Sequence, residues 1–305
     1  MKAYCVLDDY SKDAVQILTT AGISISFPHG AGRPGTDELK KLVKNFDILI
    51  IGAKEQMTNE VYRECSSLKY LCTLSIGIDH IDRAFFESKE IKVINCTDSN
   101  VVSVAEHTIG LILALLKDLK TGHESSLSGL GRKGLPFMPR DIQGKTVGVL
   151  GAGKIAKEVI KLAQCFHTNI ICNTLHPEVH TELIGQVKFV EIQKLFLDAD
   201  ILTIHVPLTD ATRSLIGIKE LALMKNDAIL INTARLEIFN VNELVVWLKT
   251  KALISLGLDI DVDGEVDLLK ALPNNSIVTP HIAGISNEAI ARMDVEVAKK
   301  LSSFI

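Results

Sequence analysis

The sequence lacks any cysteine pair of the C-x-x-C kind, and its six cysteines are scattered singly along 305 residues. Zinc sites and redox-active dithiols use such pairs, so the pattern favours neither. We interpret the six residues as reduced thiols of a cytoplasmic protein. The first residues already have the pattern of a strand, so we expect no signal peptide.

Positive charge is also scarce, since 33 Lys and Arg stand against 37 Asp and Glu, for a net charge of -4. A chain without a basic field has no electrostatic means of holding nucleic acid or an anionic membrane surface. The most apolar segment, 101–119, is interrupted by Glu106 and His107 and falls short of an uninterrupted apolar span. We therefore expect a small-molecule partner, and we interpret this segment as a buried helix that faces a second subunit of a homodimer.

Aromatic residues make up only 5% of the chain, whereas 47% of it is hydrophobic. Many Ile, Leu and Val with few aromatics are typical of a buried parallel sheet flanked by helices. Short apolar runs alternate with amphipathic segments from residue 1 to 96, and the alternation restarts at Thr146 after one long helix and a polar loop. This pattern predicts an α/β protein with two doubly wound parallel sheets in series.

The stretch TVGVLGAGKIAKEV places Gly151, Gly153 and Ala156 between an apolar run and a helical pattern. In a dinucleotide-binding loop the first glycine permits the tight turn, the second lets the backbone approach a pyrophosphate, and the small third residue lets the helix pack on the strand. The helix N-terminus offers free N–H groups to the phosphates. The alternative is an ordinary glycine turn, which the position in the first β-α-β unit of a domain disfavours.

The acidic residue that usually follows such a loop, and that binds the ribose hydroxyls of NAD, is absent. The next predicted strand, NIIC, ends near Asn173 and Thr174, which can donate to hydroxyls or to a phosphate. No arginine marks a site for the 2'-phosphate of NADP, and nothing there repels one. We expect a cofactor of the NAD or NADP type, with relaxed choice between the two.

Three further polar residues follow predicted strands: Arg235 in INTAR, Asp259 in GLD and His281 in TPHIAG. Ligands of open α/β sheets bind beyond the carboxyl ends of the strands, so this shared position indicates a site. Each residue also has a structural alternative. Arg235 could cap a helix, Asp259 could belong to a turn, and His281 could be a hydrogen-bonded core histidine.

Together the motifs resemble the D-isomer-specific 2-hydroxyacid dehydrogenases, the family of D-glycerate, D-lactate and D-3-phosphoglycerate dehydrogenases and of formate dehydrogenase. The resemblance runs through SIGIDHID, NVVSVAEHTIGLILALL, IQGKTVGVLGAGKIA, HVPLTDATRSLIG, INTAR and TPHIAG. It implies a discontinuous flavodoxin-like substrate domain, 1–98 and 285–305, a Rossmann dinucleotide-binding domain, 99–284, and a cleft between them. The last helix, from about Asn287, would then return to the first domain.

The resemblance also implies the catalytic residues. His281 would give a proton to the substrate oxygen, and Arg235 would bind carboxylate and carbonyl together. The EP pair that normally supplies a glutamate partner for the histidine is missing, so we assign Glu265 to this role, with Asp263 as its rival. Leu236 stands where the family has a glycine, so the local loop must differ if that glycine has a positive φ. The substrate-binding residues that the resemblance implies are Lys54, Ser75, Ile76, Gly77 and Arg235.

A longer set of residues matches the family's cofactor contacts. Among them, Asp259 matches the residue that contacts the nicotinamide amide. The implied cofactor-binding residues are Val104, Gly151, Gly153, Lys154, Ile155, Asn173, Thr174, His205, Val206, Pro207, Thr212, Thr233, Ala234, Asp259 and Gly284.

The resemblance implies an oxidoreductase that transfers a hydride between the nicotinamide and a small D-2-hydroxy or 2-oxo acid. The sequence has no clear cluster of Arg and Lys for a phosphate, so we expect an unphosphorylated acid such as glyoxylate, hydroxypyruvate or glycerate. The alternative is an NAD(H)-sensing or corepressor-like protein on the same fold, which the departures near Arg235 and Glu265 would fit. A metal-dependent 3-hydroxyacid enzyme is disfavoured, because no cluster of His and carboxylates is evident and we expect no metal.

Overall fold

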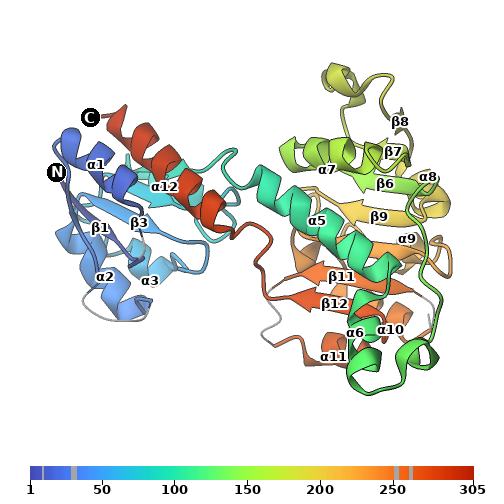
Figure 1. Ribbon diagram of the computed structural model, residues 1–305. Coiled ribbons are helices and arrows are strands. Elements are labelled where there is room, and N and C mark those ends of the chain that lie inside the picture. The colour runs from blue at the N-terminus through green and yellow to red at the C-terminus, as the bar shows by residue number, and fades with distance from the viewer. Residues whose placement is uncertain (9, 29–32, 251–253, 261–263) are drawn as a thin grey trace. The chain divides into compact units, whose positions relative to one another are not determined.

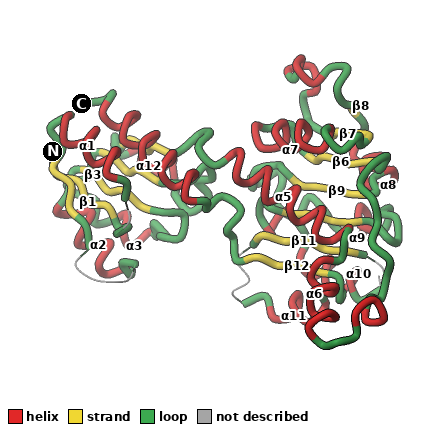
Figure 2. The backbone as a smooth tube through the Cα atoms, viewed as in Figure 1, coloured by secondary structure: helices red, strands yellow, loops and turns green. Residues whose placement is uncertain are grey.

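The computed structural model describes the whole chain except residues 9, 29–32, 251–253 and 261–263 (Figure 1). The chain forms two compact units, of which unit 1 is Met1–Asn100 with Ile285–Ile305 and unit 2 is Val101–Gly284. In each unit every strand pairing is parallel, so each unit has one parallel sheet with helices on its faces (Figure 2). The two doubly wound sheets predicted from the alternation of apolar and amphipathic segments are thereby confirmed.

Unit 1 has a five-stranded sheet in the order β2-β1-β3-β4-β5, so the chain reverses direction across the sheet between β1 and β3. This is the strand order of flavodoxin-like folds. Its elements are β1 (Lys2–Cys5), α1 (Lys12–Thr20), β2 (Ser24–Ser26), α2 (Thr36–Asn45), β3 (Ile48–Ile51), α3 (Asn59–Tyr62), β4 (Tyr70–Thr73), α4 (Arg83–Ser88), β5 (Lys92–Asn95) and α12 (Asn287–Ser302).

The central strand β3, with the sequence ILII, is buried at every position because helices cover both faces of the sheet. On one face α1 and α12 lie side by side, and Leu18 and Val297 pack with Ile48 (Figure 1). On the other face α2 and α3 pack against the opposite side of the same strand. Ser286 caps α12 by accepting from the Ala289 N–H, which starts the helix at the point where the chain re-enters unit 1.

Unit 2 has a seven-stranded sheet in the order β12-β11-β10-β9-β6-β7-β8. The chain reverses direction across this sheet between β6 and β9, and ligands of open α/β sheets bind at such points. Its elements are α5 (Val101–Leu116), α6 (Leu119–Leu127), η1 (Gly131–Gly134), β6 (Thr146–Leu150), α7 (Lys154–Gln164), β7 (Asn169–Asn173), η2 (Pro177–Val179), η3 (Thr181–Leu183), β8 (Lys188–Phe189), α8 (Ile192–Asp198), β9 (Ile201–Ile204), α9 (Ile218–Leu221), β10 (Ile229–Asn232), η4 (Leu236–Ile238), α10 (Val241–Leu248), β11 (Ser255–Asp259), α11 (Val266–Ala271) and β12 (Ser276–Thr279).

Two hydrophobic clusters cover the two faces of this sheet. On one face α5 and α7 pack side by side, and Ile112 and Val159 contact the cluster that contains Val149. On the other face the only tryptophan, Trp247 of α10, is buried among residues of α8 and β11. Within the part of the chain that the structure describes, no helix is both long and apolar enough to cross a membrane.

The segment after α5 differs from the prediction. We expected one helix from Val101 to Lys120 followed by a loop, but α5 ends at Leu116 and a second helix, α6, runs to Leu127. The break lies at Asp118, whose φ of +48° is in the left-handed region and therefore stops a right-handed helix. Periodicity of apolar residues does not show such a break, because α6 is polar.

Candidate active site

The carboxyl ends of the strands of unit 2 lie level with one another. Leu150, the last residue of β6, pairs with Asn173 of β7 and with Ile204 of β9. On the other side of β9, Ile204 pairs with Asn232, the last residue of β10, and Asn232 pairs with the residue before Asp259, the last residue of β11. All the predicted catalytic and cofactor residues that follow these strands are therefore at one edge of one sheet.

The glycine loop joins β6 to α7 and leaves the N-terminus of α7 without a side-chain cap. Gly151 has a φ of +100°, and a Cβ there would lie 2.7 Å from the His205 carbonyl oxygen, so only glycine fits. A Cβ at Gly153, the N-cap, would meet nothing within 4 Å. Among the described residues, the N–H groups of Gly153, Ile155 and Ala156 donate to no acceptor. Open space before free N–H groups at the positive end of a helix fits a pyrophosphate.

Asn173 closes β7 and is partly committed to the fold. Its carbonyl oxygen accepts from the Gly151 N–H at 2.8 Å, and its side-chain Nδ2 donates to the Val190 carbonyl oxygen at 2.9 Å. Thr174, the next residue, is half-buried and follows directly at the end of the strand. An acidic residue would bind the ribose at this position. Here the position has the amide of Asn173, which is bonded to Val190 after β8, and the hydroxyl of Thr174.

The turn after β9 contacts the end of β6. The His205 N–H donates to the Leu150 carbonyl oxygen at 2.8 Å, and His205 Nε2 lies 2.8 Å from the Thr203 hydroxyl. Burial lowers the pKa of His205 to about 3, so its ring stays neutral at physiological pH. Farther along, the Thr212 hydroxyl donates to the Pro207 carbonyl oxygen at 2.5 Å and closes the turn.

Thr233, which follows β10, contacts α5. Its hydroxyl lies 3.0 Å from the Thr108 hydroxyl, which donates to the Val104 carbonyl oxygen at 2.8 Å. Val104 and Thr233 are both buried. The structure therefore brings these two predicted cofactor residues together through a threonine that the sequence reasoning did not single out.

Arg235 and His281 lie close together although 46 residues separate them. Arg235 Nη1 is 3.5 Å from His281 Nε2 and also donates to the Ala234 carbonyl oxygen at 3.0 Å. The fully buried Asn232 fixes the turn that carries Arg235, because its Nδ2 donates to the Arg235 carbonyl oxygen and its Oδ1 accepts from the Ala234 N–H, both at 2.9 Å. Sequence reasoning missed Asn232, although it is part of the INTAR motif.

Asp259 holds the segment that carries His281. Its Oδ1 accepts from the Thr279 hydroxyl at 2.6 Å and from the Ile282 N–H at 2.8 Å, and its Oδ2 accepts from the Ala283 N–H at 2.7 Å. Asp259 is fully buried. These three hydrogen bonds fix the backbone on both sides of His281, whose own φ is +55°. A carboxylate that accepts three hydrogen bonds can be buried without a cation.

His107 of α5 extends this network. Its Nε2 lies 3.0 Å from the Thr279 hydroxyl and 3.9 Å from Asp259 Oδ1. The single hydroxyl hydrogen of Thr279 is directed at the carboxylate, so the network assigns the hydrogen of the His107–Thr279 bond to Nε2. Thr279 and His107 were both missed, and the only signal for them was their place in the TPH and AEHT motifs.

Glu265, the predicted partner of His281, follows β11 at the start of α11. Glu265 is the half-buried N-cap of α11, and among the described residues no hydrogen bond or ion pair joins it to the histidine. Its rival, Asp263, lies outside the described residues. Leu236 begins η4, has no positive φ, and buries its side chain in the core with 6% exposed. The residue in place of the family's glycine is thus part of the hydrophobic core.

The predicted substrate loop of unit 1 follows β4 and presents free N–H groups. The Ser75 hydroxyl donates to the Gly77 carbonyl oxygen at 2.7 Å and lies 2.8 Å from the Thr73 hydroxyl. Among the described residues, the N–H groups of Ser75, Ile76 and Gly77 donate to no acceptor. Successive free N–H groups of this kind bind anions. Lys54 is exposed in the loop after β3 of the same sheet.

Two residues of unit 1 that were not predicted support this loop. The ring of His80, a buried residue, lies 3.1 Å from the Thr73 hydroxyl, and Asn95 donates to the Ile76 carbonyl oxygen at 2.9 Å. No group of three or more His, Cys, Asp or Glu side chains in the described ranges could hold a metal ion.

Comparison with known proteins gives one consistent family. The NAD binding domain of the D-isomer specific 2-hydroxyacid dehydrogenases matches residues 109–283. The chain is 32% identical over 303 residues to D-3-phosphoglycerate dehydrogenase of Methanocaldococcus jannaschii, with 98% of this chain and 57% of that protein covered. It is 31% identical over 302 residues to hydroxypyruvate reductase of Thermotoga maritima, with 97% and 96% covered.

A solved structure agrees with these relatives. An acyclic imino acid reductase in complex with NADPH and D-Arg matches with a TM-score of 0.89 and 27% identity, with 100% of this chain and 97% of that chain covered. The chain spans little more than half of the phosphoglycerate dehydrogenase but nearly all of the hydroxypyruvate reductase. Because the domain match covers more than half of the sequence and its motifs are those expected, the chain belongs to the family of D-isomer specific 2-hydroxyacid dehydrogenases.

Proposed function

We propose that the protein is a D-2-hydroxyacid dehydrogenase that works as a reductase of a small unphosphorylated 2-oxo acid, with hydroxypyruvate and glyoxylate as the first substrates to test. The observation that carries this proposal is the 3.5 Å approach of Arg235 Nη1 to His281 Nε2, at the same sheet edge as the open N-terminus of α7. A permanent cation beside a titratable ring, next to a dinucleotide loop, suits reduction of a carbonyl.

The glycine loop would hold the pyrophosphate of the cofactor through the free N–H groups at Gly153 and Ile155. Thr174 would contact the ribose, since the Asn173 amide is committed to Val190. When bound, a reduced nicotinamide supplies the hydride. We propose that NADH and NADPH are both accepted, because no carboxylate at the end of β7 repels a 2'-phosphate.

Arg235 would bind the carboxylate and the carbonyl oxygen of the substrate and stabilise the negative charge that develops on that oxygen. Arg235 Nη1 lies 3.5 Å from His281 Nε2, and in the neutral ring an unprotonated Nε2 would accept the proton of a 2-hydroxy acid. For reduction, a proton on the same Nε2 atom would pass to the carbonyl oxygen. One histidine thus serves both directions.

Asp259 is a positioning residue in this proposal, besides the nicotinamide contact that the family resemblance implies. Its hydrogen bonds to Thr279, Ile282 and Ala283 fix the backbone around His281, and His107 supports Thr279 from α5. The carboxylate therefore acts on the proton transfer through the position of His281.

Glu265 stays our proposed partner of the imidazolium form of His281. The variant Glu265→Gln tests this assignment through the pH profile of turnover, because loss of the carboxylate should move the reductive and oxidative limbs to lower pH. An unchanged profile would transfer the role to Asp263 or remove it.

In unit 1, the three free N–H groups of Ser75–Gly77 would bind the substrate carboxylate, with Lys54 adding positive charge. In this proposal the residues of unit 1 would bind the anion, and those of unit 2 would transfer the proton. A homodimer in the cytoplasm remains our expectation from the sequence.

A panel of acids assayed with NADH and with NADPH tests the function. It contains glyoxylate, hydroxypyruvate, pyruvate and, because the structural relative is an imino acid reductase, a 2-oxo acid mixed with an amine. D-3-phosphoglycerate is assayed in the reverse direction with NAD⁺ and with NADP⁺. We expect turnover of at least about 1 per second with one unphosphorylated 2-oxo acid. Absence of turnover across the panel with both cofactors would contradict the proposal and favour the sensor alternative.

A further inference from the structure

Arg33 lies at the carboxyl edge of the unit 1 sheet and has no role in the reaction as proposed so far. Its Nη1 donates to Glu55 Oε1 at 2.8 Å. The Glu55 side chain, in the loop after β3, is 1% exposed, whereas the Arg33 side chain is 47% exposed. The pair therefore consists of a buried carboxylate and a guanidinium that is open to solvent on its other side.

Glu55 is itself fixed to the end of β3. Its Oε2 accepts from the N–H of Gly52, the residue that directly follows the strand, at 2.7 Å. One carboxylate oxygen is thus bonded to the backbone and the other to Arg33. Hydrogen bonds between charged groups are stronger than neutral ones, and this carboxylate is shielded from water. We conclude that Glu55 holds the guanidinium of Arg33 at the strand end.

Gly52 provides the space in which the guanidinium lies. A Cβ at this position would be 3.0 Å from both Arg33 Nη1 and Glu55 Oε2, and 3.6 Å from Arg33 Nη2. Separations near 3.0 Å are shorter than the optimal contact of about 3.5–4.0 Å between non-bonded carbon atoms. Any other side chain at Gly52 would therefore displace the guanidinium from its place against the backbone.

This place is next to the Ser75–Gly77 loop, which presents free N–H groups for the substrate carboxylate. β3 pairs in parallel with β4, with Ile51 opposite Thr73, and the loop begins two residues after Thr73. The Thr73 hydroxyl donates to the Gly52 carbonyl oxygen at 3.4 Å. Neighbouring strands lie roughly 4.8 Å apart. The guanidinium and the loop are therefore about one strand spacing apart along the same edge, within the length of a small acid.

The charge of the pair indicates which group Arg33 would bind. Glu55 balances the charge of Arg33, so the pair as a whole attracts a second anion only weakly. The guanidinium still has N–H donors on Nη2 and Nε, for which no acceptor is present among the described residues. Such donors suit the oxygen of a neutral hydroxyl group. A methyl group in the same place would leave them without an acceptor.

We propose that Arg33 determines the specificity for the substituent at C3 of the substrate, by donating to the hydroxyl oxygen of a 3-hydroxy-2-oxo acid such as hydroxypyruvate. This inference rests on the proposed function, in which the Ser75–Gly77 loop binds the carboxylate of a 2-oxo acid. Glyoxylate has no C3 and pyruvate has a methyl group there, so neither gains from Arg33. Glu55 is a positioning residue, because it acts only through Arg33.

Steady-state kinetics of the variant Arg33→Met with hydroxypyruvate, pyruvate and glyoxylate test the assignment. We expect KM for hydroxypyruvate to rise at least about tenfold with little change in kcat, because a contact remote from the reacting atoms binds substrate and transition state alike. The values for pyruvate and glyoxylate should change less than about twofold. The matched control is Arg83→Met, since Arg83 also pairs with a glutamate, Glu87, but its side chain is 64% exposed on α4.

The variant Glu55→Gln tests the positioning role with a readout that a loss of structure would not give. Glutamine keeps an acceptor for the Gly52 N–H but leaves the charge of Arg33 unbalanced. We expect the preference for hydroxypyruvate over pyruvate to fall, and kcat/KM for the 3-phosphate ester of hydroxypyruvate to rise. A wild type that prefers this phosphate ester to hydroxypyruvate would overturn the proposal, and so would an equal loss for all three acids in Arg33→Met.

A binding measurement separates this proposal from the proposed function. Calorimetric titration of the full chain with hydroxypyruvate and with pyruvate is done in the presence of NAD⁺, which has no hydride to give. Arg33→Met should weaken the binding of hydroxypyruvate at least about tenfold and leave that of pyruvate unchanged. Absence of turnover with every acid would contradict the proposed function, whereas equal binding of hydroxypyruvate by wild type and Arg33→Met would overturn the role of Arg33.

Discussion

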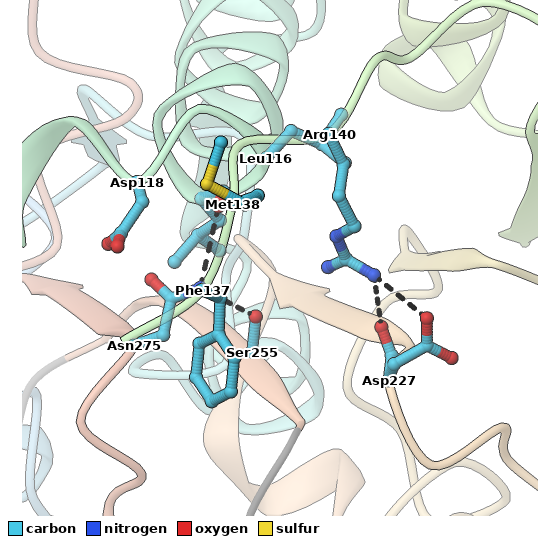
Figure 3. A pocket seen from close by; sticks show the side chains of 9 residues that line it. Leu116, Asp118, Phe137, Met138, Arg140, Asp227, Ser255 and Asn275 are labelled. Carbon is cyan, nitrogen blue, oxygen red and sulfur yellow. Dashed lines mark hydrogen bonds and ion pairs between the residues drawn. The ribbon is translucent and has the colours of Figure 1, made fainter. Parts of the chain in front are cut away.

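A buried carboxylate lies at each edge of the unit 2 sheet, and the two differ in how many hydrogen bonds they accept. At the carboxyl edge, Asp259 is fully buried and accepts three hydrogen bonds, from Thr279, Ile282 and Ala283. At the amino edge, Asp118 lines a pocket with the first residue of β11, is 5% exposed and accepts none from the described residues (Figure 3). The comparison teaches that burial alone does not show how a carboxylate is held: Asp259 accepts from three donors of the fold, whereas Asp118 accepts from none among the described residues.

Neutralising the two carboxylates should have opposite effects on stability. Asp259→Asn leaves two N–H donors facing an amide, so we expect the free energy of unfolding to fall by about 2–4 kcal/mol. Asp118→Asn removes an unpaired buried charge, so we expect a gain of about 1 kcal/mol. Urea unfolding followed by the fluorescence of Trp247, which is buried in unit 2, measures both. If both variants change the free energy of unfolding in the same direction, the two carboxylates do not differ as described.

Alanine substitutions of two glycines at the carboxyl edge should distinguish an effect on stability from an effect on cofactor binding. Gly151→Ala meets the His205 carbonyl oxygen at 2.7 Å with a φ of +100°, so we expect a loss of about 3 kcal/mol of stability. Gly153→Ala meets nothing within 4 Å, so stability should stay within about 0.5 kcal/mol.

The same Gly153→Ala variant should nevertheless bind NADH at least tenfold more weakly, a cost of about 1.4 kcal/mol, because its methyl group occupies the space before the helix N-terminus. Fluorescence titration of NADH measures this. Wild-type affinity in Gly153→Ala would show that the pyrophosphate binds elsewhere.

Because of His205, the free energy of unfolding should fall as the pH is lowered. Its pKa is lowered from 6.5 to about 3 in the fold, so the unfolded chain takes up the proton first as the pH falls. Its contribution to stability is complete above pH 6.5 and is lost progressively down to pH 3, at up to about 1.4 kcal/mol per pH unit.

Urea unfolding at a series of pH values between 6 and 4 tests this, with His205→Gln expected to flatten the pH dependence. The matched control is His176→Gln, because the His176 side chain is 72% exposed and its loss should leave the slope unchanged. Equal slopes for wild type and His205→Gln would show that the ring is already free to protonate in the fold.

The smallest expected effect concerns the choice of cofactor. The dissociation constants of NADH and NADPH should agree within about tenfold, or 1.4 kcal/mol. Thr174→Asp places a carboxylate at the end of β7 and should shift the ratio at least tenfold toward NADH, by repulsion of the 2'-phosphate. If the wild type prefers NADH to NADPH by more than a hundredfold, a group other than Thr174 distinguishes the two riboses.

The sequence was sufficient for the fold class, because short apolar runs such as ILII and TVGVL are buried on both faces only in a covered parallel sheet. It was also sufficient to place polar residues after the strands. It could not show the break at Asp118, because a left-handed φ depends on the packing around one residue and leaves no periodic signal.

Contacts between distant residues were beyond the sequence. The approach of Arg235 to His281 and the bond from His107 to Thr279 both join segments that only the fold brings together. For Glu265, the sequence predicted a position after β11, but among the described residues no hydrogen bond or ion pair joins it to His281. Local spacing places a residue at an edge, and the direction of its side chain depends on packing.

The central claim is that His281 transfers the proton in a reaction whose cofactor is held elsewhere on the same edge. The most direct test is turnover of hydroxypyruvate at saturating NADH by wild type and His281→Ala, with NADH affinity measured on the same samples. We predict that kcat falls by about 10² or more while the dissociation constant of NADH changes less than about twofold. Turnover of His281→Ala at the wild-type rate would contradict the account.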